Sequence, residues 1–172
     1  AAVFDPDKLS WLNEHYIKYT PPKALALHLE PFLISKGILQ EDHGLNVEEI
    51  AKVIPSLNQR AKTLAEMAEK STFYFKKEVE FDEKAKAKFL VPEVRPLLEK
   101  AIVGLSQLDS FSVEEIEALF NQVVKEEGVK LGKLAQPIRV ALTGATVSPG
   151  IYDVILLLGK KESLKRLNQA LP

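Results

Sequence analysis

The stretch Ser112-Val-Glu-Glu-Ile-Glu-Ala-Leu-Phe-Asn-Gln-Val-Val124 decides the fold class of this chain. A serine followed three residues later by a glutamate has the form of a capping box, in which two side chains satisfy backbone N–H groups at a helix start. Behind it, the apolar residues between Ile116 and Val123 recur at the spacing of one helical face. The stretch therefore predicts an amphipathic helix.

The same capping pattern occurs earlier, where Asn46 and Glu49 precede an apolar series at helical spacing. Helix signals recur along the whole chain, whereas the alternation typical of strands is nearly missing. We therefore predict an all-α fold. The expected helices cover residues 5–19, 24–37, 46–55, 56–70, 83–90, 92–107, 112–123, 131–142, 148–158 and 160–171.

Several residues are expected to set helix boundaries. Asp5 before Pro6 has the form of an N-cap followed by a first-turn proline. Gly37 is expected to end a helix, and Pro55 should kink or restart one. The pair Ser148-Pro149 should reopen a helix after a glycine-bordered loop.

The helical period fades between Ser71 and Asp82, where an apolar segment looks extended. We interpret this segment as the seam between two helical subdomains. The predicted domains are residues 1–80 and 81–172.

Composition narrows the classes of protein. With 172 residues, 46% of them hydrophobic, the chain can bury a core, and a formal charge of −1 excludes a polybasic binder. The charge is uneven, because residues 129–172 hold seven basic and two acidic residues. This basic end fits an anionic partner, although a solvated helix face explains it equally well.

The chain has no cysteine, which excludes disulfides, thiol nucleophiles and thiolate metal sites. No apolar run has the length of a membrane span, and the first residues lack a signal-peptide pattern. We therefore expect no membrane partner and a cytoplasmic location. The chain begins with alanine and not with methionine, which suggests a segment of a longer protein.

Catalytic and cofactor motifs are absent from the sequence. The three histidines His15, His28 and His43 are too scattered for a metal site, and neither glycine-rich phosphate-binding motif occurs. Asp109, with Ser112 and Glu115, has the spacing of helix capping rather than of an acid–base pair. We expect no catalytic residue, metal or cofactor in this chain.

The densest pattern is the run Lys130-Leu-Gly-Lys-Leu-Ala-Gln-Pro-Ile-Arg-Val-Ala-Leu-Thr-Gly144, followed by Ser148-Pro149-Gly150 and then Gly159-Lys-Lys. It places the guanidinium of Arg139 near a loop and the N-terminus of the next helix, which together could present donors to single-stranded bases. An ordinary helical hairpin with a solvated Arg139 is the structural alternative.

This run resembles the C-terminal signature of bacterial glutamyl-tRNA synthetases, K-L-[AG]-x-[PL]-[ILMV]-R-x-A-[LV]-T-G before an S-P-G helix start. At the other end, the segment from Phe4 to Ile17 resembles the F-D-x-x-K-L-x-W-[LMF]-N-x-x-Y-I segment of that family. The resemblance implies an all-helical tRNA-binding region, with a stem-contacting bundle followed by a helical cage for the anticodon loop.

The resemblance also implies roles for single residues. Arg139 should face the third anticodon base; Ser148 and Pro149 should contact the second, with Ile151 packing nearby. Lys52 takes the place of an arginine that discriminates at the first base in some members, but lysine lacks the planar fork of a guanidinium. The remaining expected tRNA contacts, mainly to the backbone, are Lys133, Arg60, Lys62 and Asn13.

The implied partners are tRNA(Glu), with tRNA(Gln) as an alternative, and a catalytic domain upstream in the same polypeptide. The H-I-G-H and K-M-S-K-S signatures that hold ATP do not occur in this chain. The catalytic domain would therefore be the part that uses ATP and Mg²⁺. Two other classes stay open from the residues alone. One is a helical protein-interaction module without RNA affinity, and the other is a small helical enzyme.

Overall fold

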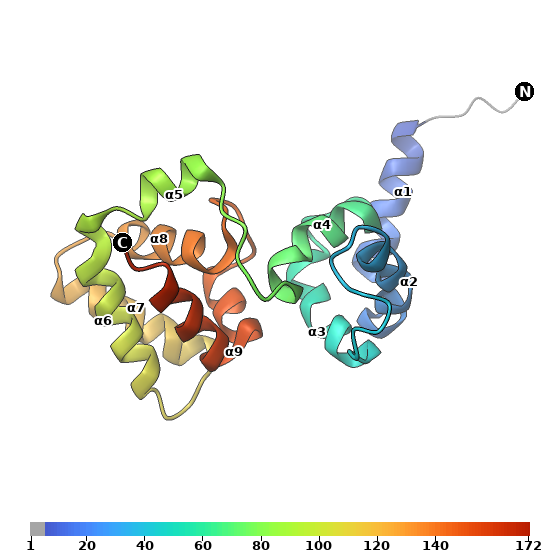
Figure 1. Cartoon of the computed structure of the whole chain (residues 1–172). Helices are drawn as coiled ribbons and strands as arrows, with labels where there is room; N and C mark the ends of the chain where they lie inside the picture. The colour runs from blue at the N-terminus through green and yellow to red at the C-terminus, as the bar shows by residue number, and fades with distance from the viewer. Residues whose placement is uncertain (1–5) are drawn as a thin grey trace, which may run out of the picture. The chain divides into compact units, whose positions relative to one another are not determined.

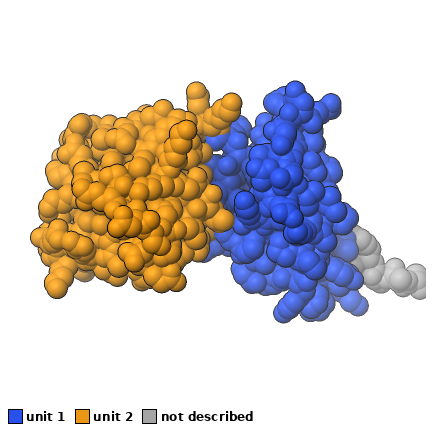
Figure 2. All heavy atoms as spheres, turned by 90° about the horizontal axis from the view of Figure 1, so that it is seen from below, with its two compact units in different colours: residues 1–76 blue, residues 77–172 orange. Residues whose placement is uncertain are grey.

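The computed structural model describes residues 6–172 and divides the chain into two units, residues 1–76 and 77–172 (Figure 2). All the regular secondary structure assigned within the described residues is helical, which confirms the all-α prediction. The predicted N-cap Asp5 and the Phe4-Asp5 match lie outside the described residues. In the described part, no helix is long and apolar enough to cross a membrane.

The first unit is built around α2 (Pro22–Ser35), which lies against α3 (Val47–Leu57) and α4 (Leu64–Phe75) (Figure 1). The predicted capping box at Asn46 and Glu49 is present and starts α3. Gly37 follows α2 with a φ of 65°, as expected for a glycine at a helix end. The core of this unit includes Leu25, Leu29, Leu33, Ile50, Ile54, Leu57, Met67 and Ala68.

The first helix, α1 (Pro6–Tyr19), adds little to this core. Among its described side chains, Ile17 alone is buried. The apolar face predicted from the sequence is formed, but it remains exposed; its members include Leu9, Leu12 and Tyr16.

The second unit surrounds α8 (Leu131–Thr143) with α5 (Glu83–Phe89), α6 (Arg95–Gln107), α7 (Val113–Glu126) and α9 (Ile151–Gln169) (Figure 1). A short 3₁₀ turn, Pro92–Val94, precedes α6. The predicted helix break at Gly159 appears as a kink inside α9, where this glycine has a φ of 78°. The residues of α8 from 137 to 143 are buried except Arg139, so α8 is the inner helix of the unit.

Two predictions around residues 55–75 were wrong. α3 continues through Pro55 to Leu57, with this proline exposed in the last turn. The break comes later, where Thr63 caps α4 by accepting a hydrogen bond from the N–H of Glu66. Residues 73–75 belong to the last turn of α4 and are not extended.

Two boundaries also differ from expectation. The division at residues 76 and 77 lies before the predicted boundary at 80, because Val79 and Glu80 already lie against Gly144 of the second unit. That contact ties the segment before α5 to the second unit. Ser148 and Pro149 do not open a helix; they lie in the loop, and α9 begins after Gly150.

Candidate nucleic-acid interface

The junction between α8 and α9 contains the densest cluster of predicted site residues. α8 ends at Thr143 and is capped by Gly144, whose φ of 77° lies in the left-handed region, and the loop runs to Gly150. The hydroxyl of Thr143 donates to the carbonyl of Arg139 at 2.8 Å and accepts from the N–H of Ala145 at 3.3 Å. These bonds fix the first turn of the loop onto the last turn of the helix.

The guanidinium of Arg139 binds the other end of the same loop. Its Nη1 donates to the carbonyl of Pro149 at 2.7 Å, to the carbonyl of Ser148 at 3.4 Å and to the Ser148 hydroxyl. That hydroxyl in turn donates to the Pro149 carbonyl at 2.9 Å. The arginine is therefore half-buried and held by the loop, unlike the solvated arginine of a plain helical hairpin.

The residues next to Arg139 and Ser148 differ in how much of their surface is exposed. Pro149 is buried, and Ile151 is only 6% exposed, so its side chain supports the loop from the core. Val147 is 78% exposed and lies one residue before Ser148. The surface available to a ligand is therefore formed by the loop backbone and the residues before Ser148.

Gly144 meets a second constraint besides its backbone angle. A Cβ atom placed on it would lie 1.9 Å from the carbonyl oxygen of Glu80 and 3.2 Å from Val79. Only glycine, which has no Cβ atom, fits at position 144, because the backbone of Glu80 approaches it so closely. The segment before α5 therefore packs directly on the start of the loop.

Arg166 supports the junction from the second half of α9. Its side chain is 3% exposed; Nη1 donates to the carbonyl of Leu142 at 2.8 Å, and Nε donates to Glu162 at 2.8 Å. The ion pair and hydrogen bonds compensate the burial of this charge. Sequence reasoning missed this role; the spacing of Glu162 and Arg166 was the visible signal, but the carbonyl lies 24 residues away.

The remaining predicted contacts lie elsewhere. Lys133 is exposed in the first turn of α8, in the same unit as Arg139. The other four, all exposed, belong to the first unit: Lys52 in α3, Arg60 and Lys62 in the turn before α4, and Asn13 in α1. The structure thus brings Arg139, Ser148 and Pro149 together within the second unit, whereas those four belong to the first.

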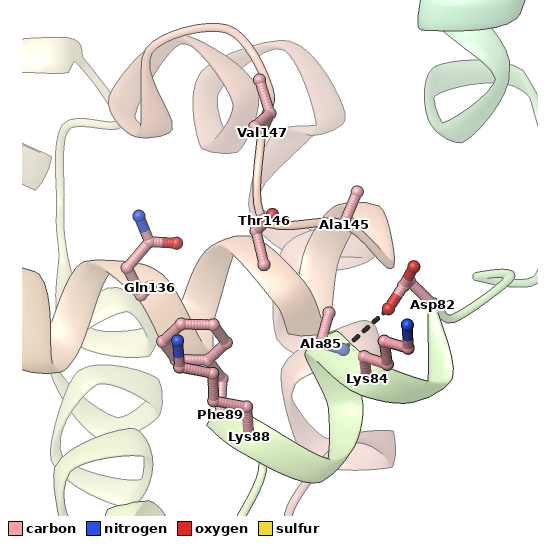
Figure 3. A pocket seen from close by; sticks show the side chains of 9 residues that line it. All are labelled: Asp82, Lys84, Ala85, Lys88, Phe89, Gln136, Ala145, Thr146 and Val147. Atoms are coloured by element: carbon pink, nitrogen blue, oxygen red, sulfur yellow. Dashed lines mark hydrogen bonds between the residues drawn. The ribbon is translucent and has the colours of Figure 1, made fainter.

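A pocket of about 460 Å³ lies beside the loop (Figure 3). Its wall consists of the α5 region, Gln136 of α8 and loop residues 145–147. The side-chain oxygen of Gln136 is buried and accepts no hydrogen bond from the described residues. Sequence reasoning did not find this pocket, because α5 and the loop are about 60 residues apart along the chain.

Comparisons with known proteins find relatives over nearly the whole chain. A glutamate–tRNA ligase of Syntrophobacter fumaroxidans is 49% identical over 171 residues, which are 99% of this chain and 36% of that protein. A glutamate–tRNA ligase of Thermodesulfovibrio yellowstonii is 44% identical over 170 residues, 99% of this chain and 37% of that protein. This chain spans about a third of the length of these relatives.

The structural comparison gives the same result. A crystal structure of a glutamate tRNA ligase from Elizabethkingia meningosepticum matches with a TM-score of 0.84 at 26% identity, over 99% of this chain and 33% of that chain. The family model for the anticodon binding domain matches residues 24–171. Since that match covers most of the sequence and includes the whole α8–α9 junction, the chain belongs to the anticodon-binding domain family.

Proposed function

We propose that this chain recognises the anticodon of tRNA(Glu) as one part of a glutamate–tRNA ligase, an enzyme that joins glutamate to tRNA with ATP. The family match and the relatives named above support this function over a protein-interaction module. In this proposal, the chemistry takes place in a catalytic domain upstream, which would bind ATP and Mg²⁺. This chain contributes recognition and no cofactor.

The observation that carries the proposal is the contact of Arg139 with Ser148 and Pro149. A guanidinium offers donors in a planar fork, which suits the acceptor edge of a base. Since the loop already orients this side chain, RNA binding would lose less conformational freedom there. We assign Arg139 to the third anticodon base, and the backbone and hydroxyl at Ser148 and Pro149 to the second.

The first unit contributes weaker assignments. Lys52 would approach the first base, and as a point charge it discriminates less sharply than an arginine, which leaves tRNA(Gln) as a second substrate. Asn13, Arg60, Lys62 and Lys133 would contact the RNA backbone. Such contacts position the RNA but do not read its sequence.

The test compares wild type with Arg139→Lys and Arg139→Ala on glutamate-type anticodon stem-loops. Each loop carries either the natural third anticodon base or a substituted one. Lysine can still donate to the Pro149 carbonyl but lacks the fork, so it separates loop support from base reading. We expect Arg139→Lys to lose about 1–3 kcal/mol of binding free energy, roughly 5- to 150-fold in affinity. The loss should fall mainly on the loop that carries the natural third base.

Arg95→Ala is the matched control, because this arginine lies exposed in the same unit and pairs with Glu99. It should leave the preference between the two loops unchanged. If both Arg139 variants lose affinity equally for both loops, Arg139 only supports the loop. If wild type itself shows no preference for glutamate-type anticodons, the proposed function is wrong.

A further inference from the structure

The structure points to a second RNA contact beside the Arg139 cluster. We infer that the pocket between α5 and the α8–α9 loop receives a nucleotide that flanks the anticodon, and that Gln136 recognises an exocyclic amine on its base. This inference rests on the proposed function, because it takes the same RNA as the ligand. It adds a site that the three anticodon bases do not use.

The first support is the carboxamide of Gln136. Its oxygen is buried and has no hydrogen-bond donor among the described residues, which leaves an acceptor unsatisfied at a cost in free energy. The terminal torsion of glutamine is broad, so the amide can turn into the adjoining pocket without a large rotamer penalty. A ligand that donates an N–H there would satisfy the oxygen. Adenine, cytosine and guanine carry such an amine, whereas uracil does not.

The second support is the charge of the opposite wall. Lys84 and Lys88 line the pocket one helical turn apart on α5 (Figure 3). Among the described residues, neither ammonium forms an ion pair with a carboxylate. The acidic residue of the wall, Asp82, accepts the N–H of Ala85 at 2.8 Å as a helix cap. The wall therefore favours a phosphodiester next to the base.

The third support is continuity with the proposed anticodon site. Gln136 and Arg139 lie three residues apart on α8, so they are neighbours on the helix surface. Thr146 and Val147 line the pocket and lead directly into Ser148. Val147 exposes 78% of its surface at this edge, where an apolar side chain can pack against the flat face of a base. A strand whose bases reach Arg139 thus passes the mouth of the pocket.

The size of the pocket agrees with this occupant. A cavity of about 460 Å³ lies within the range of small-molecule sites and exceeds the room that one anion needs. A phosphate alone would engage the two lysines but leave the Gln136 oxygen without a donor. The pairing of an unsatisfied acceptor with a basic wall therefore favours a nucleotide over an inorganic anion.

The test uses Gln136→Leu, which removes the amide and keeps a similar volume. Because the lost acceptor has no partner among the residues that the structure describes, thermal unfolding should show no loss of stability. Gln122→Leu is the matched control, since this glutamine lies exposed on α7 and pairs with Glu126. The ligands are the natural anticodon stem-loop and a series in which one flanking base at a time lacks its exocyclic amine.

For wild type, we expect one flanking position at which loss of the amine weakens binding about fivefold. Gln136→Leu should bind the natural loop about fivefold more weakly and should no longer respond to that amine. The control should behave as wild type. Preference for the third anticodon base should persist in Gln136→Leu, which separates this site from the Arg139 cluster.

Three results would overturn the inference. The first is that Gln136→Leu binds the natural loop as tightly as wild type. The second is that its loss is the same for every flanking base, with or without the amine. The third is competition by inorganic phosphate that depends on Lys84 and Lys88 but not on Gln136, which would show an anion site instead. If wild type prefers the correct anticodon in any of these cases, the proposed function stands and this inference alone fails.

Discussion

The charged side chains expected to meet RNA lie in two different environments. In the second unit, Arg139 is half-buried and donates to the loop that it borders. In the first unit, Lys52, Arg60 and Lys62 are exposed. A side chain that neighbours already hold loses less freedom on binding and can test the shape of a base, whereas an exposed cation can follow a phosphate of any sequence. The difference predicts base specificity at Arg139 and sequence-independent affinity at Arg60 and Lys62, whereas Lys52, assigned to the first anticodon base, should discriminate only weakly.

The largest expected effect is on the free energy of unfolding and comes from a glycine in the second unit. Gly144→Ala requires an alanine at a φ of 77° and a Cβ atom 1.9 Å from the Glu80 carbonyl oxygen. The backbone angle alone costs roughly 1–2 kcal/mol, and the clash adds to it, so we expect a loss of about 3 kcal/mol in unfolding free energy. Urea denaturation measures this loss.

Two glycines of the same unit separate the causes. Gly128 has a φ of 63° with open space around it, so Gly128→Ala should cost about 1–2 kcal/mol from the angle alone. Gly132 lies in α8 with open space and no positive φ, so Gly132→Ala should stabilise by up to about 1 kcal/mol. Equal losses for Gly144→Ala and Gly128→Ala would show that the Glu80 contact does not constrain the loop.

Local chemistry explains which parts of this fold were predictable. The capping box at Asn46 and Glu49 acts within four residues, so its pattern was readable in the sequence. The cap at Thr63 uses the same chemistry, but the apolar spacing that runs through Pro55 hid it. The spacing of the run placed the Arg139 guanidinium near the loop, where its hydrogen bonds to Ser148 and Pro149 put it, whereas the assignment of Arg139 to an anticodon base stays a prediction.

Contacts between distant segments explain what the sequence did not reveal. Glu80 on Gly144, Arg166 on Leu142 and the pocket at Gln136 each join residues that no local pattern relates. The predicted boundary at residue 80 differed for the same reason, because Val79 and Glu80 lie against Gly144 at the start of the loop. Periodicity locates helices, but it does not tell which loop a neighbouring segment covers.

A second prediction concerns the buried cation behind the junction. Arg166→Met would leave the Leu142 carbonyl without its donor and Glu162 without its closer partner. We expect a loss of about 2 kcal/mol in unfolding free energy, and a weaker preference for the third anticodon base because the end of α8 is less well held. Lys165→Met is the control, since Lys165 is exposed and lies 3.6 Å from Glu162. If both variants unfold alike, Arg166 does not support the junction.

A third prediction tests the exposed setting of the first unit. Lys62→Ala removes an ammonium but keeps the backbone N–H that donates to Glu66 at 2.8 Å, so the fold should not change. The affinity for every tRNA should fall by the same factor, whatever its sequence. The slope of log affinity against log salt should shrink by about 1. Lys36→Ala is the control, because Lys36 pairs with Glu69 in the same unit. A sequence-dependent loss for Lys62→Ala would contradict the assignment of this lysine to the RNA backbone.

The smallest effect should come from Glu66, which holds the turn that carries Arg60 and Lys62. The backbone N–H of Lys62 donates to its carboxylate, and the side chain of Lys70 adds a second hydrogen bond, so the pKa of Glu66 lies below its ordinary value of 4.5. A depressed pKa in the folded state means that this group stabilises the fold above its ordinary pKa and loses that contribution as the pH falls below it.

Glu66→Gln keeps an acceptor for the Lys62 N–H but cannot ionise, so it should flatten this part of the stability profile between neutral pH and pH 3. The carboxylate is more than a third exposed, and water therefore screens its interactions; we expect a difference of no more than about 0.5 kcal/mol from wild type at pH 7. Urea denaturation at several pH values measures it, with Glu41→Gln at an exposed turn as the control. An effect as large as that of Arg166→Met would mean that the turn in the first unit is held as firmly as the α8–α9 junction, and the contrast between a rigid base reader and exposed phosphate contacts would then no longer hold.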